Sequence, residues 1–157
     1  MPMLAPAPPF RSFYPTSPIA GRELAVFALG VEEWMPPVIV DRPQGSGDWL
    51  FMAFHQEVVL RIDGVERQVP GPSLMIWSPR RAHWYGNLSG RWRHSWMHAQ
   101  GSAVARALAE AGTPVDRPLI GVPARVLEQA VAAMHDEVER ERTPDPAIIE
   151  LQLRALA

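Results

Sequence analysis

Histidine and aromatic residues alternate between residues 83 and 98, and such an alternation could line a binding site. Successive side chains of a β-strand point to opposite faces, so every second residue of Trp92–His98 would share a face. One face would carry Trp92, His94, Trp96 and His98. The other would carry Arg91, Arg93, Ser95 and Met97, a set that suits contact with solvent.

The preceding strand candidate places His83 and Tyr85 on one face and Trp84 on the other. Two neighbouring strands that each present a histidine and a large aromatic residue could form the wall of a pocket. An indole stacks on the apolar face of a sugar ring, while imidazole, phenol and guanidinium groups bind its hydroxyls. The alternative is a barrel core in which the histidines are satisfied internally. As a group, the residues favour a ligand pocket.

Metal binding is the competing chemistry, because histidines and carboxylates are common metal ligands. A metal-dependent cupin enzyme, such as an isomerase or dioxygenase, would draw its ligands from His55, Glu57, His83 and His94. The first metal motif of cupins requires two close histidines, and the segment from 49 to 62 offers only one. We therefore expect neither a metal nor another cofactor.

Other catalytic signatures are missing from the sequence. No serine lies in a nucleophile-elbow context, and there is no glycine-rich phosphate-binding loop. We predict no catalytic residue and do not expect an enzyme, although the metal-dependent cupin stays open as the alternative function.

The residues from 23 to 98 show the pattern of short strands separated by turns. The strand candidates are Glu23–Leu29, Pro37–Asp41, Trp49–His55, Val58–Ile62, Glu66–Val69, Ser73–Trp77, His83–Tyr85 and Trp92–His98. Asp63-Gly64 is the strongest hairpin signal. About eight short strands at this spacing predict an antiparallel barrel or sandwich.

Helices are predicted after Gly101. Ser102–Ala111 is rich in alanine and precedes Gly112, and Pro123–Arg142 has apolar residues at helical spacing. Asp145 and Pro146 suit an N-cap and a first turn for a last helix over 147–157.

The last predicted helix is apolar on two sides, which is typical of a helix with two neighbours. Ile149, Leu153 and Leu156 form one stripe, and Ile148 and Leu151 form another. One stripe would face the preceding helix and the other a second subunit. We assign Ile149, Leu153 and Leu156 to a homodimer interface. The pattern continues to Ala157 without a helix stop, so we expect a further segment beyond it.

Composition narrows the class of protein. The chain has 157 residues, a net charge of −2, no cysteine, and 15 basic residues that are all arginine. The chain has no excess of basic residues of the kind that binds DNA, and without cysteine it cannot form disulfides. It also has no apolar run long enough to span a membrane and no signal peptide for secretion. A cytoplasmic protein is expected. The proline-rich start, with aromatic residues at 10, 13 and 14, would be either a loose leader or an arm that folds over the pocket.

Three blocks of sequence resemble the N-terminal, arabinose-binding-like domain of AraC-type transcription regulators. They are DRPQG at 41–45, PGPSLMIWSPRRAHWYG at 70–86 and RWRHSW at 91–96, and AIIELQLRAL near the end resembles the dimerising helix of that family. The resemblance implies a cupin-like antiparallel β-barrel (jelly roll) without metal, a small sugar-like effector, and a homodimer formed through C-terminal helices. It also implies DNA binding through a C-terminal domain that this chain does not include.

The resemblance also suggests roles for single residues. It implies that Arg42 hydrogen-bonds a sugar, that Trp96 stacks on its ring, and that His83, Tyr85 and His94 line the pocket. The family's threonine contact on the first strand has no hydroxyl counterpart in Ala28-Leu29-Gly30, so the resemblance does not extend to arabinose.

By the same resemblance, Phe13 or Tyr14 would close the arm over the ligand. The expected division is an arm over 1–22, an effector-binding barrel over 23–115 and a helical dimerisation segment over 116–157.

Overall fold

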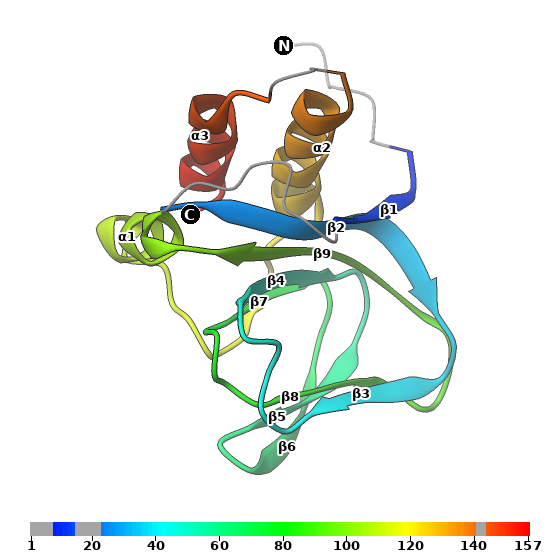
Figure 1. The fold of residues 1–157 in the computed structure, drawn as a ribbon. Coiled ribbons are helices and arrows are strands. Elements are labelled where there is room, and N and C mark those ends of the chain that lie inside the picture. Colours follow the sequence, from blue (N-terminus) through cyan, green and yellow to red (C-terminus); the bar gives the residue numbers. More distant parts are fainter. Residues whose placement is uncertain (1–7, 15–22, 141–143) are drawn as a thin grey trace.

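Two antiparallel sheets face each other, and three helices cover the outside of the larger one (Figure 1). The computed structural model describes residues 8–14, 23–140 and 144–157. The six-stranded sheet has the order β1 (Phe10–Phe13), β2 (Ala25–Met35), β9 (Trp92–Gln100), β4 (Trp49–Phe54), β7 (Ser73–Trp77), β10 (Leu119–Ile120). The four-stranded sheet has the order β3 (Val38–Arg42), β8 (His83–Asn87), β5 (Val58–Ile62), β6 (Val65–Val69).

This arrangement confirms the antiparallel, cupin-like fold class, with the barrel open as two facing sheets. The hairpin predicted at Asp63-Gly64 joins β5 to β6, with Ile62 opposite Val65. Both turn residues have positive φ, 51° and 78°, as a two-residue type I′ turn requires.

Strands of the larger sheet are covered on both faces, which explains their nearly continuous apolar sequences. In β4, Leu50, Met52 and Phe54 point into the space between the sheets, whereas Phe51 and Ala53 point toward the helices. The same alternation in β7 and β9 divides the apolar side chains into an inner core between the sheets and an outer core under the helices.

One expectation about β9 is wrong. Ser95 and Met97, expected to face solvent, are both fully buried, because α2 and α3 lie over this side of the sheet. A period-two pattern shows which residues share a face but not what covers that face.

The helices agree with the predicted segments. They are α1 (Ser102–Ala111), α2 (Arg125–Arg140) and α3 (Pro146–Leu156). Gly112 ends α1 in the left-handed conformation, and the Asp145 side chain accepts a hydrogen bond from the Ala147 N–H at the start of α3. The end of the predicted second helix, at 141–142, lies outside the described residues.

The assignment of Ile149, Leu153 and Leu156 to a dimer interface needs correction. All three are buried within the chain, in the outer core beneath α3. They pack against the chain's own sheet and helices and do not present a surface to a partner. The second stripe is the exposed one, since Ile148 is 40% and Leu151 is 62% exposed.

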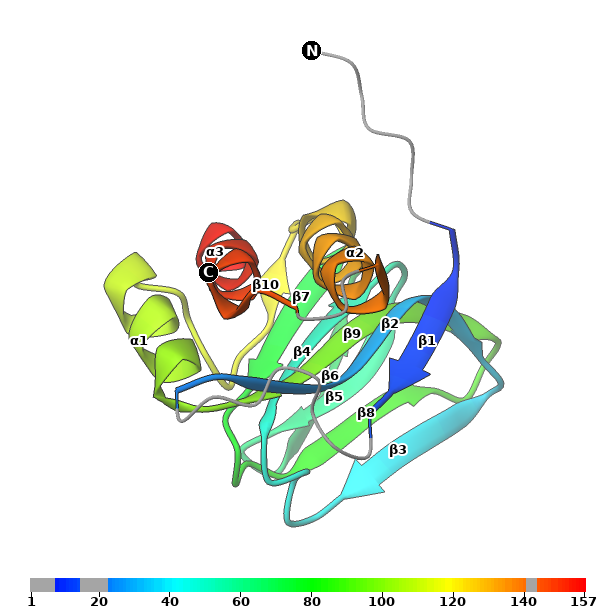
Figure 2. The ribbon, with the colours of Figure 1, turned by 45° about the horizontal axis from the view of Figure 1, so that its top comes forward.

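The described part of the N-terminal arm forms an edge strand. Residues 10–13 pair antiparallel with β2, Phe10 lying opposite Val31 and Phe13 opposite Ala28 (Figure 2). The rest of the predicted arm, 1–7 and 15–22, lies outside the described residues. None of the helices in the described ranges is long and apolar enough to cross a membrane.

Candidate functional site

A small cavity of about 130 Å³ lies between the two sheets and is open at one side. Its lining comes from six strands and comprises Phe13, Glu33, Met35, Val40, Arg42, Met52, Tyr85, His94, Trp96 and His98. Four of the five residues expected to bind ligand therefore meet around one space, together with the arm residue Phe13. Strands far apart in sequence bring them together, because β3 and β8 face β2 and β9 across the inner core.

Trp96 forms one wall of this cavity, and Gly30 makes its position possible. The two residues are register partners on β9 and β2. A Cβ atom at residue 30 would lie 2.5 Å from the indole Cε2, so only glycine leaves room for the ring. The indole Nε1 donates a 2.7 Å hydrogen bond to Glu33 Oε2, and the Phe13 ring lies 5.3 Å from the indole between centroids.

Glu33 is the carboxylate of the site, and the sequence reasoning missed it. Besides Trp96, it contacts His94 (Nε2 to Oε2, 3.6 Å) and Arg11 (Nη1 to Oε1, 3.1 Å). The pKa of Glu33 is lowered most by the interaction with His94 and further by the hydrogen bonds from Trp96 and Arg11. Burial raises this pKa, but the lowering effects are larger and bring the pKa to about 2. The cavity therefore contains a fixed negative charge at neutral pH.

His98 faces the same cavity and is oriented from behind by Asp48. Its Nδ1 lies 2.8 Å from Asp48 Oδ1, and the Asp48 carboxylate is itself buried and hydrogen-bonded to Ser46. With Nδ1–H donating to the carboxylate, Nε2 is left as a hydrogen-bond acceptor. No signal beyond its place in the alternating row pointed to His98, because Asp48 is distant in sequence.

Tyr85 and Arg42 supply donors on the facing sheet. Tyr85 is buried, and burial raises its pKa to about 12, so the phenol is neutral and can donate or accept. Its ring packs against Phe54 and Trp77. Arg42, near the end of β3, forms no ion pair within the part of the chain that the structure describes, which leaves its guanidinium available.

His83 is the expected site residue that does not line this cavity. It is fully buried with its ring 5.0 Å from that of Trp77, and neither ring nitrogen makes a hydrogen bond among the described residues. Burial, with a smaller contribution from the nearby Arg42 charge, lowers its pKa to about 4. The imidazole is thus a neutral side chain of the inner core.

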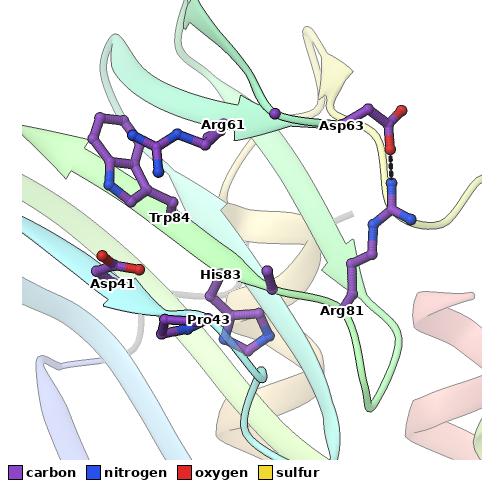
Figure 3. A pocket seen from close by; sticks show the side chains of 9 residues that line it. Asp41, Pro43, Arg61, Asp63, Arg81, His83 and Trp84 are labelled. Carbon is purple, nitrogen blue, oxygen red and sulfur yellow. Dashed lines mark hydrogen bonds and ion pairs between the residues drawn. The ribbon is translucent and has the colours of Figure 1, made fainter.

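A second, larger cavity of about 460 Å³ lies at the small sheet and borders His83 (Figure 3). Three of the four acidic and arginine side chains that line it, all except Asp41, already have partners in the chain. The Arg61 guanidinium lies 4.2 Å from the centre of the Trp84 ring and pairs with Glu66, and Arg81 pairs with Asp63. Salt bridges of this exposed kind are common surface features. The smaller cavity, with convergent polar groups around an indole, is therefore the better candidate site.

The arm reaches both the cavity and helix α2. Phe13 lines the cavity, whereas Tyr14 turns toward α2 and donates a 3.4 Å hydrogen bond to Glu139. Phe10 stacks on His135 of α2 at 4.0 Å between ring centres, and Ser12 Oγ lies 3.1 Å from His135 Nε2. Of the two expected closing residues, Phe13 is the one beside the cavity.

The four side chains that the alternative, a metal-dependent cupin enzyme, would use as ligands do not converge among the described residues. His83 and His94 lie between the sheets, His94 with its Nδ1 3.2 Å from the Met52 sulfur, while Glu57 is exposed. His55 instead contacts α2, where Nε2 is 2.7 Å from Glu128 Oε1. These residues do not fit the metal of a cupin enzyme.

His55, Glu32 and Glu128 do form a cluster on the outer face, with potential ligand atoms within 4.8 Å of one another. Each is already engaged within the chain. Glu128 accepts a hydrogen bond from Ser95 and contacts His55, and Glu32 pairs with Arg93 at 3.4 Å. The cluster is therefore organised as an ion-pair network between the sheet and α2.

Comparison with protein families decides the class. A profile of the AraC-like ligand binding domain matches residues 57–157, most of the chain. The chain belongs to this family. The AraC-like family consists of ligand-binding domains of transcription regulators, so the chain is a regulatory ligand-binding domain, as the sequence blocks predicted. No curated protein matches the chain closely enough to count as a relative.

Two solved structures show distant similarity. The cupin domain of an XRE-family transcriptional regulator from Enterobacter cloacae is 20% identical, with a TM-score of 0.33 over 49% of this chain and 82% of that one. Streptomyces albus HEPD with 2-hydroxyethylphosphonate and Fe(II) bound is 11% identical, with a TM-score of 0.33 over 99% of this chain and 45% of that one. Neither similarity assigns a ligand to this AraC-like domain.

Proposed function

We propose that this AraC-like domain senses a small, neutral, hydroxylated effector, such as a sugar, in the cavity beside Trp96. The observation that carries the proposal is the convergence of an indole with several hydrogen-bonding side chains around one small cavity. A sugar ring would place its C–H face on the indole and direct its hydroxyls to the surrounding groups.

The polar groups favour a ligand that both donates and accepts hydrogen bonds. Glu33 and His98 Nε2 offer acceptors, whereas Arg42 and the Tyr85 hydroxyl offer donors. A sugar acid would bring its charge near the ionised Glu33, and a purely apolar ligand would leave the Arg42 guanidinium and the Tyr85 hydroxyl without partners. The cavity of about 130 Å³ is open at one side, and its size limits the effector to a small molecule.

Calorimetry on the protein with a panel of pentoses, hexoses, sugar acids and small aromatic compounds tests the proposal. We expect a neutral sugar to bind and Trp96→Phe to weaken its binding at least tenfold, because a smaller ring covers less of the ligand. Trp84→Phe makes the same chemical change at the larger cavity and should leave the affinity unchanged.

Two results would contradict the proposal. If no member of the panel binds, the cavity is not a sugar site. If Trp84→Phe abolishes binding and Trp96→Phe does not, the ligand occupies the larger cavity at the small sheet. A Tyr85→Phe variant adds a finer test, since it removes one hydroxyl that makes no hydrogen bond within the described chain and should weaken sugar binding about tenfold without loss of stability.

The regulatory output that we propose is a change in how two subunits are held. In this proposal the domain dimerises through the exposed stripe of α3, formed by Ile148 and Leu151, and DNA binding resides in a domain outside this chain. An effector can shift such an assembly only by its differential affinity for two arrangements. Phe13 would then act as part of the lid over the bound effector.

A further inference from the structure

Glu33 points into the cavity, although simple alternation counted from Gly30 would turn it to the opposite face of the larger sheet and turn Glu32 inward. Glu33 lines the cavity, whereas Glu32 pairs with Arg93 on the face covered by α2. A β-bulge shifts the alternation by one residue, so that Glu33 faces the cavity in place of Glu32. Gly30 is opposite Trp96 and Glu33 is opposite His94, so Val31 and Glu32 both oppose the single residue Ser95.

The bulge is held by a hydrogen bond to a fully buried serine. The Glu32 backbone N–H donates to Ser95 Oγ at 2.9 Å. Glu32 has a φ of 53°, a left-handed conformation that is costly for a residue other than glycine and persists only where the surroundings enforce it. The serine therefore fixes the peptide unit next to Glu33 in an unfavourable geometry.

Ser95 is fixed in turn by helix α2. Its single hydroxyl proton is donated to Glu128 Oε1 at 2.7 Å, which leaves the oxygen lone pairs for the Glu32 N–H. Burial by itself would raise the pKa of Glu128, but the bonds from His55 and Ser95 and the charges of His55 and Arg93 lower it, so the carboxylate is ionised. A half-buried anion holding a buried hydroxyl is a charge-assisted and therefore strong contact.

We propose that Ser95 and Glu128 are positioning residues for Glu33, so that the seating of α2 on the sheet and the geometry of the effector cavity are energetically coupled. The coupling runs from Glu128 through the Ser95 hydroxyl and the Glu32 peptide to the Glu33 carboxylate. It deepens the proposed function, because it would make α2 the first helix to respond to an effector. Linkage requires the coupling to act equally in both directions.

The Trp96 indole N–H reports on Glu33 without any ligand. It donates to Glu33 Oε2, so its NMR signal and its hydrogen exchange depend on where that carboxylate lies. In Ser95→Ala the bulge loses its acceptor, and we expect the Trp96 indole signal to shift and its exchange to quicken about tenfold. Glu128→Gln, which keeps the shape and an acceptor oxygen but loses the charge, should have the same effect to a smaller degree.

Two controls separate coupling from general loosening. Asp136→Asn removes a carboxylate from the exposed face of α2, where it pairs only with Arg140 among the described residues, and should leave the Trp96 signal unchanged. The indole signal of Trp84, which lines the larger cavity, should not respond to any of the variants. In the reverse direction, Glu33→Gln should quicken exchange of the Glu128 amide, which donates a hydrogen bond to the Ala124 carbonyl, about tenfold.

The outcomes are decisive in either direction. A Trp96 indole that keeps its wild-type shift and exchange in folded Ser95→Ala, or that responds equally to Asp136→Asn, overturns the proposal. If Ser95→Ala does not fold, Glu128→Gln and the reverse experiment decide in the same way. Because no ligand is present, these results are independent of the sugar panel, and either proposal can fail alone.

Discussion

Acidification from pH 7 to pH 4 should destabilise the domain through His83. This histidine is fully buried, and neither ring nitrogen has a hydrogen-bond partner among the described residues, so the fold favours the neutral imidazole. In the unfolded chain the same group takes up a proton below its ordinary pKa of 6.5. The unfolded state therefore binds more protons than the native state between pH 6.5 and about 4, and stability falls as the pH falls through that window.

The size of the effect follows from the two pKa values. A pKa lowered from 6.5 to about 4 corresponds to about 3 kcal/mol of unfolding free energy, fully present above pH 6.5 and lost by pH 4. A loss of this size is a large share of the 5–15 kcal/mol by which a typical domain is stable, as a rough guide. It should lower the urea midpoint visibly within two pH units.

Urea unfolding at a series of pH values measures this loss directly. We expect His83→Gln, which does not titrate, to flatten the curve between pH 6.5 and pH 4. His135→Gln, a substitution of the same type on α2, should keep the wild-type slope because His83 is intact. The reasoning is refuted if His83→Gln retains the full pH dependence, since another group would then be responsible.

Three further predictions concern the cavity and α3. The pKa of Glu33 is about 2, below its ordinary 4.5, so this group contributes about 3 kcal/mol to the free energy of unfolding above pH 4.5. The contribution is lost as the pH falls toward 2, and Glu33→Gln should remove this loss from unfolding curves measured in acid. Gly30→Ala should push the Trp96 indole out of place, lower stability by about 1–3 kcal/mol and weaken sugar binding in calorimetry, whereas unchanged binding would contradict the tight fit. Leu151→Asp should give a folded monomer in sedimentation, while Leu153→Asp should unfold the domain. A folded Leu153→Asp monomer would show instead that the dimer interface is the stripe that contains Leu153.

Local signals in the sequence were enough for several elements. The hairpin at Asp63-Gly64, the end of α1 at Gly112 and the start of α3 at Asp145 all depend on backbone preferences of a few adjacent residues. Strand alternation predicted that Tyr85, His94 and Trp96 line a common pocket wall. The addition of Arg42 rested on the resemblance to a family, because no local rule brings β3 and β9 together. Their role in binding stays a prediction.

Errors arose where a neighbour far away in sequence decides the outcome. Simple alternation from Gly30 would turn Glu32 toward the cavity and Glu33 away from it, and only the bulge opposite Ser95 reverses the two. The stripe of α3 assigned to a partner is covered by the chain's own sheet, and the sequence of a helix does not state which of two apolar faces meets which neighbour.

What the sequence determined by itself is therefore the set of strands and helices, their turns and caps, and the side chains that share a face of each strand. These follow from steric and hydrogen-bonding preferences that act over a few residues. Only the tertiary structure decided that Glu33 lines the cavity and His83 does not, and that Gly30 leaves the space that the Trp96 indole occupies. The same holds for the hydrogen bonds by which Ser95 connects the cavity strand to α2. Each depends on the register and packing of strands far apart in the chain, which pleat periodicity alone does not specify.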